Sequence, residues 1–209
     1  MSLKSKHNQI WFRRIHIYVS MALLLITLFF AVTGITLNRP ELFEQSHPVI
    51  TQYNLEVPTD VLFKHSNSFH PEKETLITFL RKETDVRGFP SDLDVYTTVD
   101  KGELIEGEVS MDFKGPGYNA TVFVDMVSKE AEIEVTEYGV VALLNDLHKG
   151  RNSGEYWKWF IDITALLMVL FVLTGVCLLL PKKKTLNVAL KWSVLGTLIA
   201  WAVYVVAVP

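Results

Sequence analysis

The sequence predicts an α-helical membrane protein with three transmembrane helices and a polar α+β domain inserted between the first two of them. Three observations support this fold class. Apolar residues make up 49% of the 209 residues, whereas only 21% are charged. Three segments are long and apolar enough to cross a bilayer, which needs about 20 such residues. The long segment between the first two mixes polar and apolar residues as a soluble domain does.

The predicted transmembrane helices cover residues 15–37, 157–180 and 192–208. The third is the shortest, but it carries no charge. The first differs from a cleaved signal peptide, because its apolar core is too long and no clear small-x-small cleavage site follows it. We therefore expect the first segment to be a retained helix.

The placement of lysine and arginine predicts the orientation of these helices, because cytoplasmic loops are enriched in both. Basic residues precede the first span at Lys4, Lys6, Arg13 and Arg14. The loop 181–191, "PKKKTLNVALK", is also basic. Residues 1–14 and 181–191 are thus expected in the cytoplasm, which leaves the domain at 38–156 on the extracytoplasmic side.

The segment 38–156 shows the pattern of a small α+β module. "PEKETLITFLRKE" predicts a helix, and "DLDVYTTVD" and "GELIEGEVSMDFKG" predict strands. "ATVFVDMVSKEAEIEVTE" alternates as a hairpin, and "EYGVVALLNDLHKG" predicts a second helix closed by Gly150. The segment contains no nucleophile elbow, phosphate-binding loop or HExxH motif.

Charge and cysteine content exclude several classes of function. The net charge of −3 and the lack of a long basic patch argue against nucleic-acid binding. Cys177 is the single cysteine and lies within an apolar run. A disulfide framework, or a zinc or iron–sulfur site built on cysteines, is therefore excluded within one chain.

The apolar spans contain an internal repeat. "FFAVTGITLN" closes the first and "LFVLTGVCLLL" lies near the end of the second, so each carries Thr-Gly after a run of apolar residues. A histidine precedes each span, in "RRIHIYVS" and in "LNDLHKGRNSGEYWKW". The Thr-Gly pairs have a simple explanation, because small residues let helix backbones approach closely in lipid. The recurring histidine, apolar helix and Thr-Gly motif is the alternative interpretation.

These residues resemble the PepSY-associated transmembrane proteins. The likeness rests on the histidine at the head of the first span, the Leu-His-Lys-Gly element, the two Thr-Gly spans and the hairpin "VFVDMVSKEAEIEV". It covers about residues 13–180. It implies a bacterial inner-membrane protein with a periplasmic PepSY-like domain. Members of this family include haem-containing reductases of ferric siderophores and small proteins that promote ferrous iron uptake; larger members have more spans and more membrane histidines.

The resemblance implies haem b, with His16 and His148 as ligands of the haem iron. One haem cannot join both, because they lie at opposite ends of a hydrocarbon core about 30 Å thick. Two options remain: each iron has one histidine and a different sixth ligand, or a homodimer with its two-fold axis along the membrane normal brings each histidine to its mate. Because the first two spans run in opposite directions, Gly175 is expected near the depth of His16 and Gly34 near the outer face. In the dimer each glycine then leaves room for the porphyrin. Lys149 and Arg151 are expected near the propionates, since arginine binds carboxylates bidentately.

The predicted function is electron transfer across the membrane to ferric iron or a ferric chelate at the periplasmic face. The electron donor would be a separate cytoplasmic protein or a quinol, and the ferrous product would go to an iron transporter. Whether the chain is an enzyme, as a haem-dependent ferric (siderophore) reductase, stays open. The alternative is a membrane-anchored PepSY module that modulates a transporter or peptidase. A histidine-based metal chaperone would instead use His65 and His70, a weaker metal site.

Overall fold

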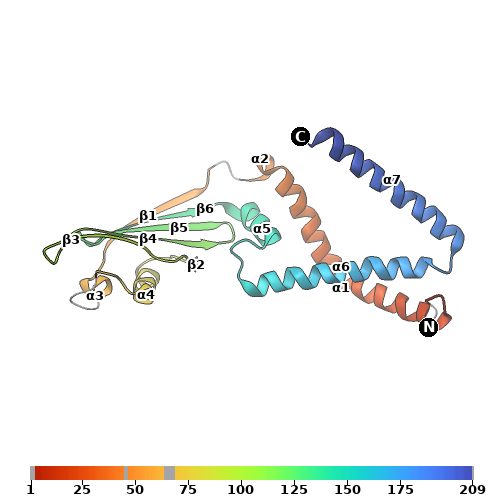
Figure 1. Ribbon diagram of the computed structural model, residues 1–209, viewed down its shortest axis with the longest axis horizontal. Helices are drawn as coiled ribbons and strands as arrows, with labels where there is room; N and C mark the ends of the chain where they lie inside the picture. The colour runs from red at the N-terminus through yellow and green to blue at the C-terminus, as the bar shows by residue number, and fades with distance from the viewer. Residues whose placement is uncertain (1–2, 45–46, 64–68, 209) are drawn as a thin grey trace. The chain divides into compact units, whose positions relative to one another are not determined.

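The computed structural model describes residues 3–44, 47–63 and 69–208. The chain divides into two compact units, of which one comprises residues 1–28 with 161–209 and the other residues 29–160. Their helices and strands are labelled in Figure 1.

Within the described residues, three long helices are apolar enough to cross a membrane, by length and composition: α1 (Lys6–Asn38), α6 (Glu155–Leu179) and α7 (Lys183–Ala207). Most of their large apolar side chains are exposed, which suits side chains that face lipid. α1 ends directly before Arg39-Pro40, and the residue before a proline disfavours helical dihedral angles. The short helix α2 (Pro40–Phe43) follows with proline at its first position.

The unit at residues 29–160 is built on one antiparallel sheet. The strands are β1 (Val49–Glu56), β2 (Phe89–Pro90), β3 (Asp94–Asp100), β4 (Glu103–Gly115), β5 (Tyr118–Asp125) and β6 (Glu130–Glu137). The order across the sheet is β1-β6-β5-β4-β2, and β3 also pairs with β4. The predicted hairpin is confirmed as β5 and β6, which are paired from Tyr118 with Glu137 to Asp125 with Glu130.

One face of the sheet forms the hydrophobic core. Residues alternate between buried and exposed along β5 and β6, as expected for strands with one covered face. The helices α3 (Thr59–Leu62) and α4 (Lys73–Glu83) lie against this face (Figure 1). Leu62, Leu76 and Leu80 of these helices pack with Phe113 and Val122 of the strands, and all five are fully buried. The predicted helix at 71–83 is thus confirmed as α4.

The last helix before the second span is α5 (Gly139–Lys149), and it ends as the sequence predicted. Gly150 adopts a left-handed conformation with φ of 66°, which glycine reaches without steric cost. The backbone N–H groups of Gly150 and Arg151 donate to the carbonyls of Leu147 and Asp146. Such a cap fixes the end of the helix at the residue that follows His148 and Lys149.

Candidate functional site

The predicted ligand His16 lies on α1 and its imidazole contacts α6. Its Nδ1 is 3.1 Å from the carbonyl oxygen of Phe171 and 3.1 Å from the hydroxyl oxygen of Thr174. The ring also stacks on Phe171, with 4.5 Å between centroids and 13° between planes. His16 is therefore held from two directions, by hydrogen bonds at Nδ1 and by an aromatic ring against its face.

Gly175 is the reason that the imidazole of His16 fits between the helices. A Cβ atom at position 175 would lie 3.3 Å from Cε1 of His16, closer than side chains ordinarily pack. The sequence predicted that Gly175 lies at the depth of His16, and the structure brings the two together. The space above this glycine is occupied by the imidazole of the same chain.

The contact with Phe171 assigns the tautomer of His16. A carbonyl oxygen can only accept a hydrogen bond, so Nδ1 must carry the hydrogen. Nε2 of the neutral ring then holds an available lone pair. Within the described part of the chain, no hydrogen bond reaches this nitrogen. An Nδ1–H donor bound to a backbone carbonyl is the usual arrangement of a histidine that binds metal through Nε2.

The second predicted ligand, His148, lies on the last turn of α5 and contacts α1. Its Nδ1 is 2.6 Å from the hydroxyl oxygen of Thr33. The edge of Phe30 meets the ring with 5.0 Å between centroids and an interplanar angle of 76°. A Cβ atom at position 34 would lie 3.7 Å from Cε1 of His148, an ordinary contact distance. Gly34 thus lies next to the imidazole of His148, as Gly175 lies next to that of His16.

A buried polar contact next to His148 fixes α5 against α1. Asn145 is only 3% exposed and lies one turn before His148. Its side-chain oxygen lies 2.6 Å from the hydroxyl oxygen of Thr36, which is also 2.9 Å from the carbonyl oxygen of Thr33. Its nitrogen donates a hydrogen bond of 3.0 Å to Glu44. The indole N–H of Trp157 donates to the carbonyl of Leu147 over 2.8 Å. The turn that precedes His148 is therefore held by contacts of Asn145 and of the Leu147 carbonyl.

The two sites use the same residue types in the same pattern. Each has the spacing Phe-x-x-Thr-Gly on one helix, at Phe30–Gly34 and at Phe171–Gly175, and a histidine from another segment. The sequence predicted the histidines and glycines but assigned no role to the threonines or phenylalanines. The repeated Phe-x-x-Thr-Gly spacing was the available signal. Asn145 was also missed, although a lone amide within "VVALLNDL" is unusual on an apolar helix face.

Of the two cations near His148, Arg151 pairs with an acidic side chain of the domain. Nη1 of Arg151 lies 3.9 Å from Oδ1 of Asp146, whose other oxygen accepts the backbone N–H of Gly117 over 2.9 Å. Lys149 and Arg151 both line a cavity of about 490 Å³. Burial of the imidazole lowers the pKa of His148, and the nearby charge of Lys149 lowers it further.

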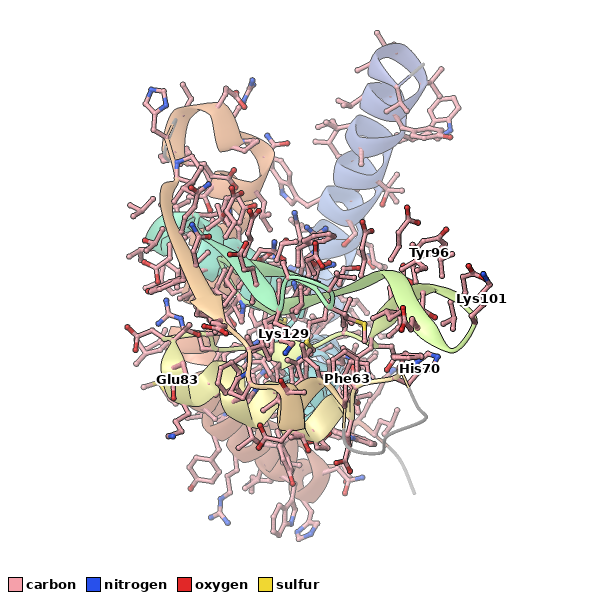
Figure 2. All side chains as sticks on the ribbon, turned by 90° about the vertical axis from the view of Figure 1, so that its left-hand side faces the viewer. Phe63, His70, Glu83, Tyr96, Lys101 and Lys129 are labelled. Carbon is pink, nitrogen blue, oxygen red and sulfur yellow. The ribbon has the colours of Figure 1, made fainter. Side chains whose placement is uncertain are left out.

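The weaker metal-site prediction rests on His65 and His70. His65 lies outside the described residues. His70 is exposed (Figure 2). Among the residues described, no group of three or more histidine, cysteine, aspartate or glutamate side chains is arranged to hold a metal ion. The His65 and His70 site stays a prediction.

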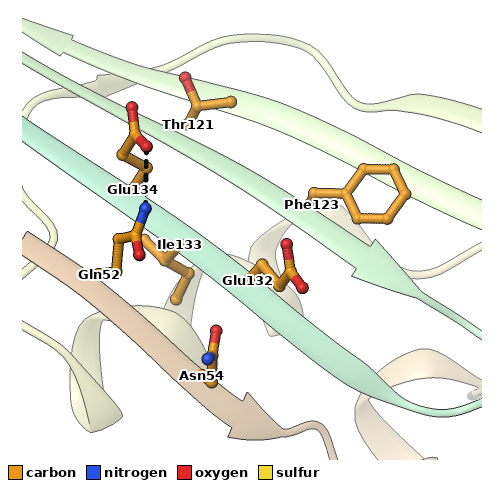
Figure 3. A pocket seen from close by; sticks show the side chains of 7 residues that line it. All are labelled: Gln52, Asn54, Thr121, Phe123, Glu132, Ile133 and Glu134. Atoms are coloured by element: carbon orange, nitrogen blue, oxygen red, sulfur yellow. Dashed lines mark hydrogen bonds between the residues drawn. The ribbon is translucent and has the colours of Figure 1, made fainter.

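The uncovered face of the sheet carries a shallow, polar cavity of about 390 Å³ (Figure 3). Gln52 of β1 donates a hydrogen bond of 3.2 Å to Glu134 of β6 at this surface. Glu132 lies on the same face of β6, and Phe123 of β5 points out of the sheet beside it (Figure 3). The surface is acidic and open, and it contains no histidine.

The described residues thus combine three membrane-type helices with a β-sheet domain and two histidines. The imidazole of each histidine contacts a Thr-Gly pair. Residues 10–209 match the PepSY_TM-like family, and the chain belongs to it. This confirms the resemblance to PepSY-associated transmembrane proteins. No curated protein and no solved structure gave a significant match to the chain.

Proposed function

We propose that this chain is a b-haem electron-transfer protein of the bacterial inner membrane. It reduces ferric iron or ferric chelates at the periplasmic face and thereby supports uptake of ferrous iron. The observation that carries the proposal is the pair of histidines anchored through Nδ1, each on a Thr-Gly pair, with no hydrogen bond to Nε2 within the described chain. Anchored imidazoles with one accessible nitrogen are what axial ligation of haem iron requires.

Each site supplies one imidazole from this chain. In the proposed homodimer, a second copy supplies the sixth ligand, so that His16 meets its own mate and His148 meets its own mate. By the positive-inside rule, the N-terminus is cytoplasmic and the sheet domain is periplasmic. His16 then lies toward the cytoplasm and His148 toward the periplasm, which gives the electron an entry and an exit.

The residues around the sites suit this task. Phe171 and Phe30 present apolar ring surface next to the imidazoles, which helps to exclude water. Lys149 and Arg151 follow His148 directly and carry the positive charge that propionates need. Bound haem would supply a one-electron couple. One electron converts ferric to ferrous iron without transfer of a proton, so no acid–base group is required.

The electron enters from a separate cytoplasmic protein or a membrane quinol. The chain offers no nucleotide-binding motif of its own. The ferrous product would pass to an iron transporter in the same membrane. In this arrangement the chain is a haem-dependent ferric or ferric-siderophore reductase whose residues bind and orient its cofactor.

The test is an absorbance spectrum of the detergent-purified chain, oxidised and then reduced with dithionite. We expect a Soret band with α and β bands on reduction, weakened in His16→Ala and in His148→Ala. His70→Ala, which removes an exposed histidine of the domain, is the matched control and should keep the full haem content. A colourless protein, purified after expression with ample haem, would refute the proposal and leave the PepSY module that modulates a partner.

A further inference from the structure

The direction of the hydrogen bond between Thr33 and His148 follows from a second contact of the threonine. The Thr33 hydroxyl oxygen lies 2.7 Å from the carbonyl oxygen of Phe29, one turn earlier on α1. A carbonyl oxygen can only accept, and a hydroxyl has one hydrogen to donate. Two acceptor oxygens 2.7 Å apart would repel each other, which places the Thr33 hydrogen between them, on the bond to the helix backbone. The oxygen of Thr33 is then left to accept from Nδ1–H of His148.

This direction gives His148 the same tautomer as His16. With Nδ1 protonated, Nε2 of the neutral ring carries the available lone pair. The Thr174 hydroxyl behaves likewise, because it donates to the carbonyl of Phe171 over 2.9 Å and is left to accept from Nδ1 of His16. In both helices the threonine satisfies its own hydrogen within the backbone and presents only an acceptor to the histidine.

We propose that Thr33 and Thr174 are positioning residues that fix the tautomer and ring orientation of His148 and His16, so that Nε2 is the coordinating nitrogen. The tautomer assignment stands on the hydrogen bonds alone, whereas its effect on a haem rests on the proposed function. The two threonines differ in how much of the hydrogen bonding at Nδ1 they supply. Among the described residues, Thr33 is the one acceptor for Nδ1 of His148, whereas His16 also has the Phe171 carbonyl.

The difference between Thr33 and Thr174 distinguishes a positioning role from a role in helix packing. Valine has nearly the shape of threonine but lacks the hydroxyl, so Thr→Val changes the side-chain volume little and removes the acceptor. In Thr33→Val, Nδ1 of His148 loses its acceptor and the ring can take either tautomer. In Thr174→Val, the Phe171 carbonyl still holds the hydrogen of His16. A packing role predicts no such difference.

A bound haem would respond to the same change. Donation from Nδ1–H to an acceptor makes the imidazole a more basic ligand. A more basic ligand favours ferric iron and lowers the reduction potential. Loss of the Thr33 acceptor should therefore raise the potential of the haem at His148, and loss of the Thr174 acceptor should raise that at His16 by less.

The first experiment needs no haem. The full chain, labelled with ¹⁵N-histidine and held in detergent above the ordinary histidine pKa of about 6.5, is studied by ¹⁵N NMR. Signals of His16 and His148 are assigned by their loss in His16→Gln and His148→Gln. We expect a protonated Nδ1 and an unprotonated Nε2 at both rings. Thr33→Val should shift His148 toward a mixture of tautomers, Thr33→Ser should restore it, and Thr174→Val should leave His16 nearly unchanged.

Two results would overturn the proposal: a wild-type His148 protonated at Nε2, or a His148 spectrum that Thr33→Val leaves unchanged. Redox titration of the haem-loaded chain is the second measurement. There we expect a higher potential in Thr33→Val than in wild type and a smaller rise in Thr174→Val; equal shifts would contradict the difference between the two threonines. A chain that binds no haem but shows the expected tautomers refutes the proposed function and leaves the positioning role intact.

Discussion

The two histidine sites hold the same ring against the same residue types by different means. At His16, two acceptors share Nδ1 and Gly175 lies in close contact with the ring. At His148, one acceptor holds Nδ1 and Gly34 contacts the ring at an ordinary distance. The second site compensates with Asn145, buried one turn away. Steric fit therefore restrains the first imidazole, and a polar network outside the ring restrains the second.

The largest difference between the sites is expected from Asn145→Ala. The substitution removes the acceptor of Thr36 and the donor to Glu44 in a buried position. Each of the two hydrogen bonds contributes about 0.5–1.5 kcal/mol net, so the apparent melting temperature of the detergent-solubilised chain should fall clearly. The His148 signals should broaden in ¹⁵N spectra while those of His16 stay sharp. An unchanged melting temperature would show that the polar network does not restrain His148.

A smaller effect, expected at Gly34 but not at Gly175, comes from substitution of glycine by alanine. Alanine is favoured over glycine in a helix interior by about 0.8–1.0 kcal/mol. Gly34→Ala has room for the methyl group and should raise the melting temperature. Gly175→Ala should not, because its Cβ would lie 3.3 Å from a ring already stacked and hydrogen-bonded.

Gly196→Ala in α7 is the matched control, because nothing lies within 4 Å of a Cβ placed there. It should show the gain from helix propensity alone. Equal gains at positions 34, 175 and 196 would contradict the tight fit inferred for His16.

The smallest expected effect is a dependence on pH that comes from His148. Burial first, and the charge of Lys149 second, lower the pKa of His148 in the folded, haem-free chain below its ordinary value of 6.5. The unfolded chain then binds a proton more readily. Protonation of His148 does not reduce the free energy of unfolding above pH 6.5. Below that pH it does, and the free energy of unfolding falls as the pH drops through the lowered pKa.

The measurement is the apparent melting temperature of the haem-free chain between about pH 8 and pH 5. His148→Gln should flatten this dependence, and Lys149→Gln should reduce it slightly because its charge is the lesser cause. If His148→Gln melts with the same pH profile as wild type, other groups are responsible for the profile.

Sequence patterns predicted much of the fold. The apolar length of the spans, the alternation in β5 and β6, and the glycine after α5 each have a direct physical cause in the sequence. β1 was missed. Its residues Val49–Glu56 alternate weakly, and the strand is specified by pairing with β6 at a distance in the sequence. Pairing partners of that kind leave little local signal.

The candidate sites were predicted in part for the same reason. The histidines and the Thr-Gly pairs can be read from the sequence. The opposite directions of the first two spans also predict that Gly175 and His16 lie at a similar depth in the membrane. Which atom of each histidine is held, and by what, depends on the rotation of one helix against another. Thr33 and Thr174 acquire their role only because that rotation turns their hydroxyl oxygens to Nδ1. Apolar composition and repeat spacing carry no information on that rotation.

The separation of Thr33 and His148 by 115 positions has a consequence for biogenesis. When the first span leaves the ribosome, His148, which contacts Thr33 of that span, has not yet been synthesised. Closing so long a loop in a disordered chain costs entropy, and the folding of the intervening sheet removes most of that cost by drawing its two ends together. The sheet should therefore fold before the contact between His148 and Thr33 forms.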